Sequence, residues 1–99
     1  MNYEWDPDKN LKNIKKHRVS FEQAKIALED INQLYSYDEA HSINEDRYNV
    51  FGNAKGRILV VNIVWMDEDT IRIISARRAN KNEMEAYNEN GSLFFGKST

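Results

Sequence analysis

The feature that most constrains this chain is an apolar run at residues 58–65, Ile-Leu-Val-Val-Asn-Ile-Val-Trp, which a single polar residue, Asn62, interrupts. The run has the length of a strand, is rich in β-branched side chains and presents apolar groups on both faces. A strand that is apolar on both faces has to be covered on both, so the run predicts the central strand of a sheet. The rest of the fold must be organised around it.

Shorter segments on either side show the two-residue period of strands that are covered on one face. The expected neighbours are residues 3–5, 33–37, 47 to about 52 and 71–78. Residues 52–56, with a glycine at each end, predict a hairpin connection, and the polar stretch 38–46 predicts a loop. Strict alternation in the last strand places Ile71, Ile73, Ser75 and Arg77 on one face and Arg72, Ile74, Ala76 and Arg78 on the other.

Two helices are expected between the first strand and the others. Asp6-Pro7 is typical of an N-cap followed by proline at the first helical position, and this helix should end at residues 17–19. Ser20 and Gln23 form a capping-box pattern that begins the second helix. Its apolar side chains recur at helical spacing and should pack on the sheet: Phe21, Ala24, Leu28 and Ile31.

A third helix is expected near the C-terminus. Asn80 with Glu83 repeats the cap pattern, which predicts a helix over residues 81–90 with Gly91 as its stop. Residues 91–99 would then be a short tail whose apolar side chains, at positions 93–95, either dock on the body or fray. The order of strand, two helices, four-stranded meander and helix predicts an α+β fold in which helices pack against an antiparallel sheet.

Length and composition narrow the class of protein. A chain of 99 residues has room for one core, so residues 1–99 are expected to form a single domain. The absence of cysteine excludes thiolate metal sites and thiol nucleophiles. No apolar run approaches the roughly 20 residues that a bilayer crossing needs, so we expect a cytoplasmic protein without a membrane role. No glycine-rich phosphate loop is present, and we expect no cofactor.

The net charge of −2 conceals an uneven distribution of charge. Acidic residues outnumber basic ones in residues 31–70, whereas basic residues outnumber acidic ones in residues 71–99. Two runs contain bases and no acids, namely Lys9, Lys12, Lys15, Lys16 and Arg18, and Arg72, Arg77, Arg78 and Lys81. A polyanion would have to bind at these two runs.

Several motifs stand in the order of a known family. They are Trp5-Asp6-Pro7, Lys16-His17, Val19-Ser20-Phe21-Glu22, His41-Ser42, Glu45, Arg47, Gly56-Arg57, the run 72–79 that contains Arg77-Arg78, Glu83 and Tyr87. From about Tyr3 to Tyr87 the chain resembles the BrnT toxins, with Arg18 where that family usually has glycine. The strand motif that ends in two arginines is the most specific part.

The resemblance implies a ribonuclease toxin of a bacterial toxin–antitoxin pair that arrests growth by cutting RNA. It also implies a fold similar to that of RelE and ParE toxins. The implied partner is a ribbon-helix-helix antitoxin, and DNA would be contacted only indirectly, through the complex with that antitoxin.

Cleavage of RNA without a metal needs a base, a cation for the phosphorane oxygens and preferably an acid. Arginine suits the second task because guanidinium is always charged and grips phosphate through paired hydrogen bonds. Arg77, Arg78 and Arg57 are the candidate phosphate contacts, and we favour Arg77, although strand-end arginines more often pair with acids such as Glu83. For Arg47 and Arg72 we favour a structural role over a catalytic one. The candidate RNA-binding residues are Arg57, Arg72, Lys81, Lys12 and Lys16.

Proton transfer has four candidate residues. His17 and His41 change charge near neutral pH, but a helix C-terminus accounts for the first and a surface loop for the second equally well. Glu83 and Tyr87 lie four residues apart on the expected last helix, and a structural role for Tyr87 is at least as common. Two histidines far apart in the sequence make a poor metal site, so we predict metal-independent chemistry.

Three other functions are possible alternatives to the nuclease. A toxin-like domain that has lost activity and only binds a protein partner agrees with the net charge of −2. A helix-turn-helix DNA binder is disfavoured because its second helix would present Glu22, Glu29 and Asp30 to phosphates. A small-molecule enzyme has the least support, since no nucleophile motif appears.

Overall fold

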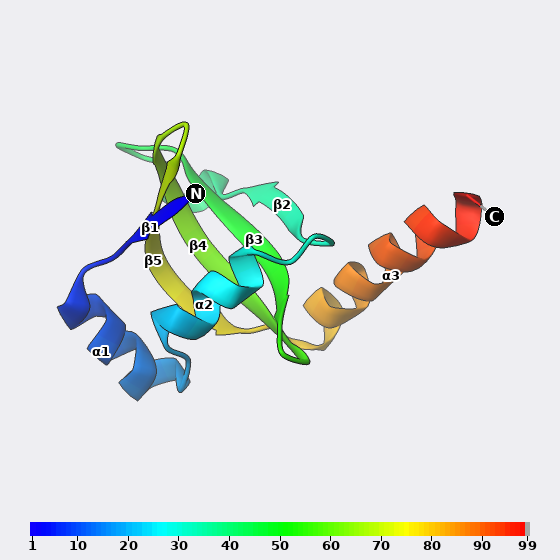
Figure 1. The fold of residues 1–99 in the computed structure, drawn as a ribbon, viewed down its shortest axis with the longest axis horizontal. Coiled ribbons are helices and arrows are strands. Elements are labelled where there is room, and N and C mark those ends of the chain that lie inside the picture. The colour runs from blue at the N-terminus through cyan, green and yellow to red at the C-terminus, as the bar shows by residue number, and fades with distance from the viewer. Residues whose placement is uncertain (99) are drawn as a thin grey trace.

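The computed structural model describes the backbone of residues 1–98 and the side chains of residues 1–89. Its elements are β1 (Asn2–Glu4), α1 (Pro7–His17), α2 (Phe21–Leu28), β2 (Leu34–Tyr37), a 3₁₀ turn η1 (Glu39–His41), β3 (Arg47–Ala54), β4 (Arg57–Asp67), β5 (Thr70–Arg78) and α3 (Lys81–Ser98). The strands form one sheet in the order β1-β5-β4-β3-β2 (Figure 1). The α+β class is therefore confirmed, and β4 lies at the centre of the sheet as predicted.

The sheet is mixed, which corrects the expectation of an antiparallel one. β2 to β5 form the expected antiparallel meander, with Asn49 opposite Asn62 and Asn62 opposite Ser75. β1 pairs in parallel with β5, and Tyr3 lies opposite Ile71. Parallel pairing needs a long connection between the two strands, and here α1, α2 and the meander supply it.

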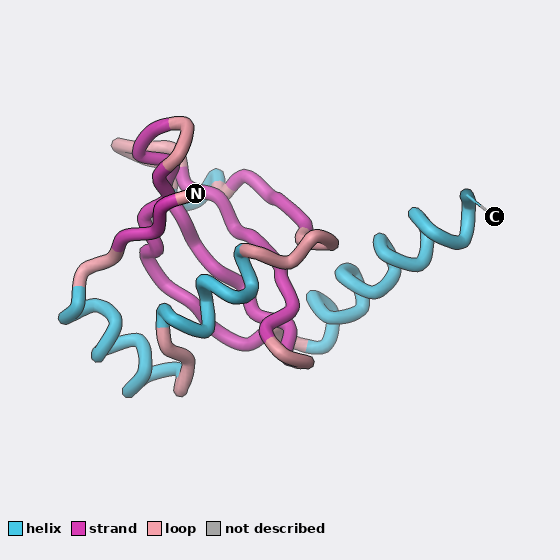
Figure 2. Tube along the Cα trace, in the orientation of Figure 1, coloured by secondary structure: helices cyan, strands magenta, loops and turns pink. Residues whose placement is uncertain are grey.

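α1 and α2 cover one face of the sheet, and α3 projects away from the body (Figures 1 and 2). Phe21, Ala24 and Leu28 are buried against the core side chains of the sheet. α2 approaches β3 so closely that a Cβ added at Gly52 would lie 2.0 Å from the carbonyl oxygen of Ala27. Only glycine fits at this position of β3. The hairpin between β3 and β4 is shorter than the expected 52–56, because its turn consists of Lys55 and Gly56, with φ values of 53° and 94°.

The predicted caps are present and join the two helices tightly. Asp6 caps α1, and Ser20 and Gln23 make both hydrogen bonds of the capping box. Between the helices Arg18 adopts the left-handed conformation, with φ 59° and ψ 31°, although it has a side chain. The side chain of Asn13 is buried and bonds to the carbonyl of Val19 and to both backbone groups of Ala76, so it ties α1 to β5.

Two helix ends differ from the sequence prediction. α2 ends at Leu28, so Ile31 is not part of the buried stripe and its side chain is 94% exposed. α3 continues through Gly91 to Ser98 instead of stopping at residue 90. A glycine inside a helix costs only about 1 kcal/mol, which does not force termination. The expectation that the apolar side chains at positions 93–95 either dock or fray concerns residues whose side chains are not described.

A β-bulge at Ile74 changes the faces of β5. Asn62 lies opposite Ser75, but the next residue, Ile63, lies opposite Ile73, so Ile74 is one extra residue. Ile73 and Ala76 are both buried in the core with α1 and α2, whereas Ser75 and Arg77 lie on the opposite, open face. The expected alternation, which put Ser75 and Arg77 on the face of Ile73, is therefore wrong.

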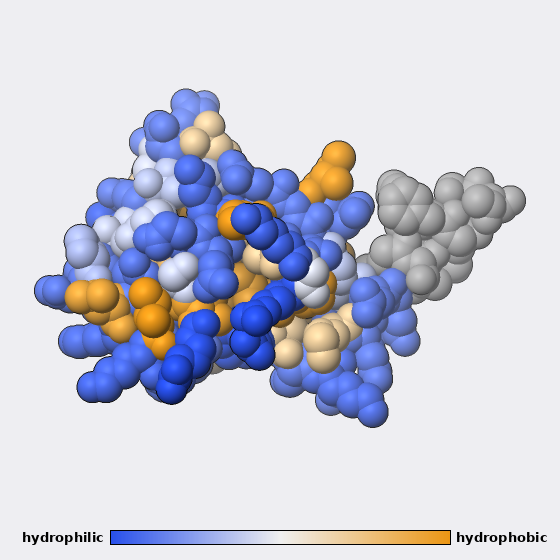
Figure 3. All heavy atoms as spheres, turned by 60° about the horizontal axis from the view of Figure 1, so that its bottom comes forward, coloured by the Kyte–Doolittle hydropathy of each residue, from blue (hydrophilic) through white to orange (hydrophobic). Residues whose placement is uncertain are grey.

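Apolar groups also appear at the surface. Leu11 and Ile14 of α1 are 66% and 37% exposed. Figure 3 shows hydrophobic residues, in orange, at the surface on its left. Among the described residues, no helix has both the length and the apolar character that a membrane crossing requires.

Candidate active site on the open face of the sheet

Three strands align polar side chains across the face of the sheet that α1 and α2 leave uncovered. Asn49, Asn62 and Ser75 are successive partners in the register of β3, β4 and β5. They form the floor of a hollow with a volume of about 250 Å³, whose lining residues are Asp38, His41, Arg47, Asn49, Asn62, Ser75 and Arg77. Pockets for whole small molecules are typically about 300–1,000 Å³, so this hollow suits one segment of a longer ligand.

Asp38 is the centre of the hydrogen bonding in the hollow. Its Oδ2 accepts from Nδ2 of Asn62 at 2.9 Å and lies 2.8 Å from Nδ1 of His41. Asn62 also donates to Oδ1 of Asn49, at 2.9 Å. Asp38 and Asn62 are each only 8% exposed. A buried carboxylate with two partners on one oxygen is held in place, and it fixes the groups around it.

Arg77 reaches the same hollow from the end of β5. Its two terminal nitrogens donate to the two carboxylate oxygens of Glu83, at 2.7 and 2.8 Å. The hydrogen bonds from Arg77 hold the pKa of Glu83 below its usual value, and Glu83 in turn raises the pKa of Arg77. Glu83 and Asn80 cap each other at the start of α3. The first turn of α3 therefore orients the guanidinium.

Arg47, at the start of β3, contributes a second guanidinium. Its Nη2 lies 3.5 Å from Oε1 of Glu45, while its Nε is buried and has no hydrogen-bond partner in the described residues. A buried donor without an acceptor lowers the stability of the fold by about 1–3 kcal/mol. The sequence favoured a structural role for Arg47, and in the structure this residue lines the hollow.

The other proton-transfer candidates lie elsewhere. His17 ends α1, on the covered side of the sheet, and does not line this hollow. The hydroxyl of Tyr87 donates to Oδ2 of Asp30, in the segment after α2. Burial and this contact with Asp30 raise the pKa of Tyr87 to about 12, so it keeps its proton near neutral pH. Glu83 reaches the site only through Arg77.

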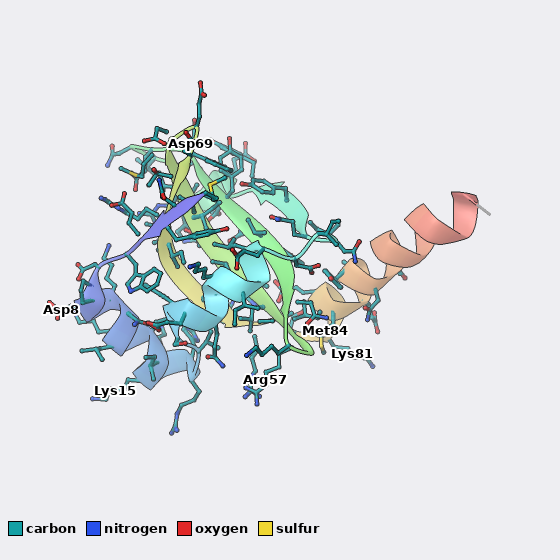
Figure 4. The ribbon with its side chains drawn as sticks, in the orientation of Figure 1. Asp8, Lys15, Arg57, Asp69, Lys81 and Met84 are labelled. Carbon is teal, nitrogen blue, oxygen red and sulfur yellow. The ribbon has the colours of Figure 1, made fainter. Side chains whose placement is uncertain are left out.

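The remaining basic candidates do not line the hollow. Arg78 lies opposite Leu59, on the other face from Arg77, and so the predicted separation of the two arginines is confirmed. Arg72 is 3.6 Å from Glu4 and lines a different hollow. Lys12 and Lys16 belong to α1, away from the hollow. Arg57 and Lys81 lie at one end of the molecule with Lys15, whereas Asp69 lies at the other (Figure 4).

Sequence reasoning missed four lining residues: Asp38, Asn49, Asn62 and Ser75. A signal was present for Asn62, because a polar residue inside an apolar central strand has to find partners. Asp38 carried no such signal within a polar loop. Among the residues whose side chains the structure describes, no three His, Asp or Glu side chains gather as metal ligands would.

The arrangement of fold and site is that of a small α+β protein with two arginines and a histidine around one polar hollow. Its family follows from comparison, since the profile described as "Ribonuclease toxin, BrnT, of type II toxin-antitoxin system" matches residues 5–83. The chain belongs to this BrnT family of ribonuclease toxins, as the motifs predicted.

A solved structure agrees with that assignment at the level of the fold. The crystal structure of the Brucella abortus ribonuclease toxin BrnT is similar with a TM-score of 0.60 and 24% identity, over 82% of this chain and 99% of that one. At this identity the likeness shows the fold alone. A search of curated proteins finds no match.

Proposed function

We propose that this protein is a metal-independent endoribonuclease that cuts RNA at the hollow on the open face of the sheet. The observation that carries the proposal is that Arg77, Arg47 and His41 line one cavity of about 250 Å³. A base and a cation in one place are what attack by a ribose 2′-hydroxyl on the adjacent phosphate needs, and this hollow offers a histidine and two arginines.

The two guanidinium groups share one task in this proposal. Arg77 presents a guanidinium that Glu83 has already oriented, and its side chain is 44% exposed, so it is accessible to a phosphate. Arg47 lines the same hollow, and its side chain is 30% exposed. Both act on the nonbridging oxygens, where negative charge grows as the phosphorane forms.

The partner and the setting follow from the family. We propose a ribbon-helix-helix antitoxin as the inhibitor, with DNA contacted only through the antitoxin complex and with action in the cytoplasm. The RelE-like character of the fold is part of the same proposal. Its support is the family membership at residues 5–83.

The test is cleavage of a defined RNA by purified, antitoxin-free protein with EDTA present. Arg77→Ala should lower the rate by roughly a hundredfold or more. Arg72→Ala is the matched control, because it removes an exposed arginine of the same strand that lines another hollow, and it should retain most of the activity. Circular dichroism confirms that each variant is folded.

Two results would overturn the proposal. Intact RNA with folded wild-type protein would show an inactive protein-binding module instead. Activity that EDTA abolishes and a divalent cation restores would show metal-dependent chemistry.

A further inference from the structure

We propose that His41 is the general base of the cleavage and that Asp38 is the positioning residue that makes it one. This inference rests on the proposed function and assigns the proton acceptor that the function needs. It starts from the contact between Nδ1 of His41 and Oδ2 of Asp38, at 2.8 Å.

The backbone between the two residues is fixed at both ends. Asp38 donates its N–H to the carbonyl of Arg47 at 2.8 Å, which joins the turn to the start of β3. Its own carbonyl accepts from the N–H of His41 at 3.3 Å and from the hydroxyl of Ser42 at 2.6 Å. The same hydroxyl accepts from the N–H of Arg47 at 2.9 Å. The loop that carries His41 is therefore a braced turn.

The carboxylate of Asp38 determines which nitrogen of His41 is free. A carboxylate has only acceptors, so the ring must donate to it from Nδ1. In the neutral ring the proton then resides on Nδ1, and the lone pair is on Nε2. A general base needs that lone pair to be exposed to the proton that it takes.

Asp38 is buried and holds the ring, whereas His41 is exposed and can reach a substrate. The side chain of Asp38 is 10% exposed and that of His41 is 67% exposed. Asn62, itself bonded to Asn49, donates to the same Oδ2 and stops the carboxylate from turning away. The ring is thus held at one nitrogen while the rest of it is open to a substrate.

The charged groups around His41 fit this task. Arg47 and Arg77 line the same hollow, and Glu45 lines an adjoining one with His41 and Arg47. In the proposed complex the Asp38 carboxylate stays beside the ring that takes the proton, and the two arginines face the phosphate.

The proposed step replaces one bond between phosphorus and oxygen by another. Nε2 of His41 takes the proton of the 2′-hydroxyl, and the 2′-oxygen forms a bond to phosphorus. The bond from phosphorus to the 5′-oxygen breaks, and that oxygen receives a proton from water or from the protonated His41. The products are a 2′,3′-cyclic phosphate and a 5′-hydroxyl, without any redox change.

The test compares His41→Gln, Asp38→Asn and the control Glu39→Gln, an exposed acid in the same turn. His41→Gln and Asp38→Asn should each lower kcat by about a hundredfold or more, with little change in KM, and Glu39→Gln should leave kcat unchanged. The fall of kcat on the acid side of the pH profile should disappear in His41→Gln.

Nitrogen NMR of the imidazole gives a readout independent of activity. In the wild type, the neutral imidazole of His41 should carry its proton on Nδ1. In Asp38→Asn the new amide can donate to Nδ1, so the proton should shift toward Nε2. The proposal is overturned if Arg77→Ala abolishes cleavage while His41→Gln or Asp38→Asn does not, or if the proton resides on Nε2 in the wild type. Absence of cleavage by the wild type overturns both proposals.

Discussion

The carboxylate of Glu83 receives two parallel hydrogen bonds from Arg77, at 2.7 and 2.8 Å, across the connection between β5 and α3. Glu83 therefore sets the orientation of the Arg77 guanidinium. The hydrogen bonds from Arg77 also lower the pKa of Glu83 in the folded protein, so this pair makes the free energy of unfolding depend on pH.

The first prediction concerns that dependence on pH. A carboxylate whose pKa is lowered on folding stabilises the protein above its unfolded pKa, near 4.5 here, and this stabilisation is lost as pH falls through the folded value. Glu83→Gln should thus cost about 1 kcal/mol at pH 7 and less at lower pH, since the pair is partly exposed. Urea denaturation at several pH values measures it. A cost that stays constant with pH would contradict the ionic contribution.

The second prediction concerns Arg18, which stands in the left-handed region with φ 59°. A residue with a Cβ is strained there, and glycine is not, so Arg18→Gly should stabilise the protein by about 1 kcal/mol. The gain would appear as a rise in Tm of several degrees. Lys16→Gly, in the preceding helical turn, is the matched control and should destabilise. A lower Tm for Arg18→Gly would show that its side chain makes a larger contribution than the strain.

The third prediction concerns Tyr87, whose hydroxyl binds Asp30. Its pKa rises from 10.0 to about 12 on folding, so its stabilisation is complete below pH 10 and is lost as pH rises toward 12. Tyr87→Phe should lose about 1.5 kcal/mol at neutral pH, and its unfolding should depend less on alkaline pH. Cleavage near neutral pH should persist, because the phenol lies away from the hollow. Loss of cleavage by folded Tyr87→Phe would return this tyrosine to the site.

The fourth prediction concerns salt. If about three phosphates of single-stranded RNA are neutralised, log affinity should fall against log salt with a slope of about −2. Removal of one contact by Arg77→Ala should make the slope less steep by about 0.7. Fluorescence anisotropy with a noncleavable 2′-deoxy substrate measures both. A flat response in the wild type would contradict binding through phosphates.

Much of the fold could be predicted from local signals. The apolar run around Val61 predicted the central strand, and Asp6 and Ser20 predicted two helix starts, because caps and periodicity are properties of neighbouring residues. The parallel pairing of β1 escaped prediction, since it depends on contacts distant in the sequence. Ile31 continued a helical pattern beyond the true end of α2 at Leu28.

The site was less predictable than the fold. Arg77 and His41 could be proposed from their chemistry and from the family motif. Their partner Asp38 could not, because it is buried only once the 38–46 loop closes over β4. The place of Arg47 beside this histidine could not be predicted for a related reason, since the two line one hollow only in three dimensions.

The extra residue at Ile74 has a consequence for how this protein can vary. Ile73 and Ala76 face the interior on either side of the extra residue, while Ser75 and Arg77 keep to the open face. Deleting Ile74 itself would leave Ile73 opposite Ile63 and Ser75 opposite Asn62, so the strand would become regular and Arg77 would keep its face. Deleting Ser75 or Ala76 instead would move Arg77 to the face that the helices cover, so length changes in β5 should be tolerated at Ile74 and not beyond it.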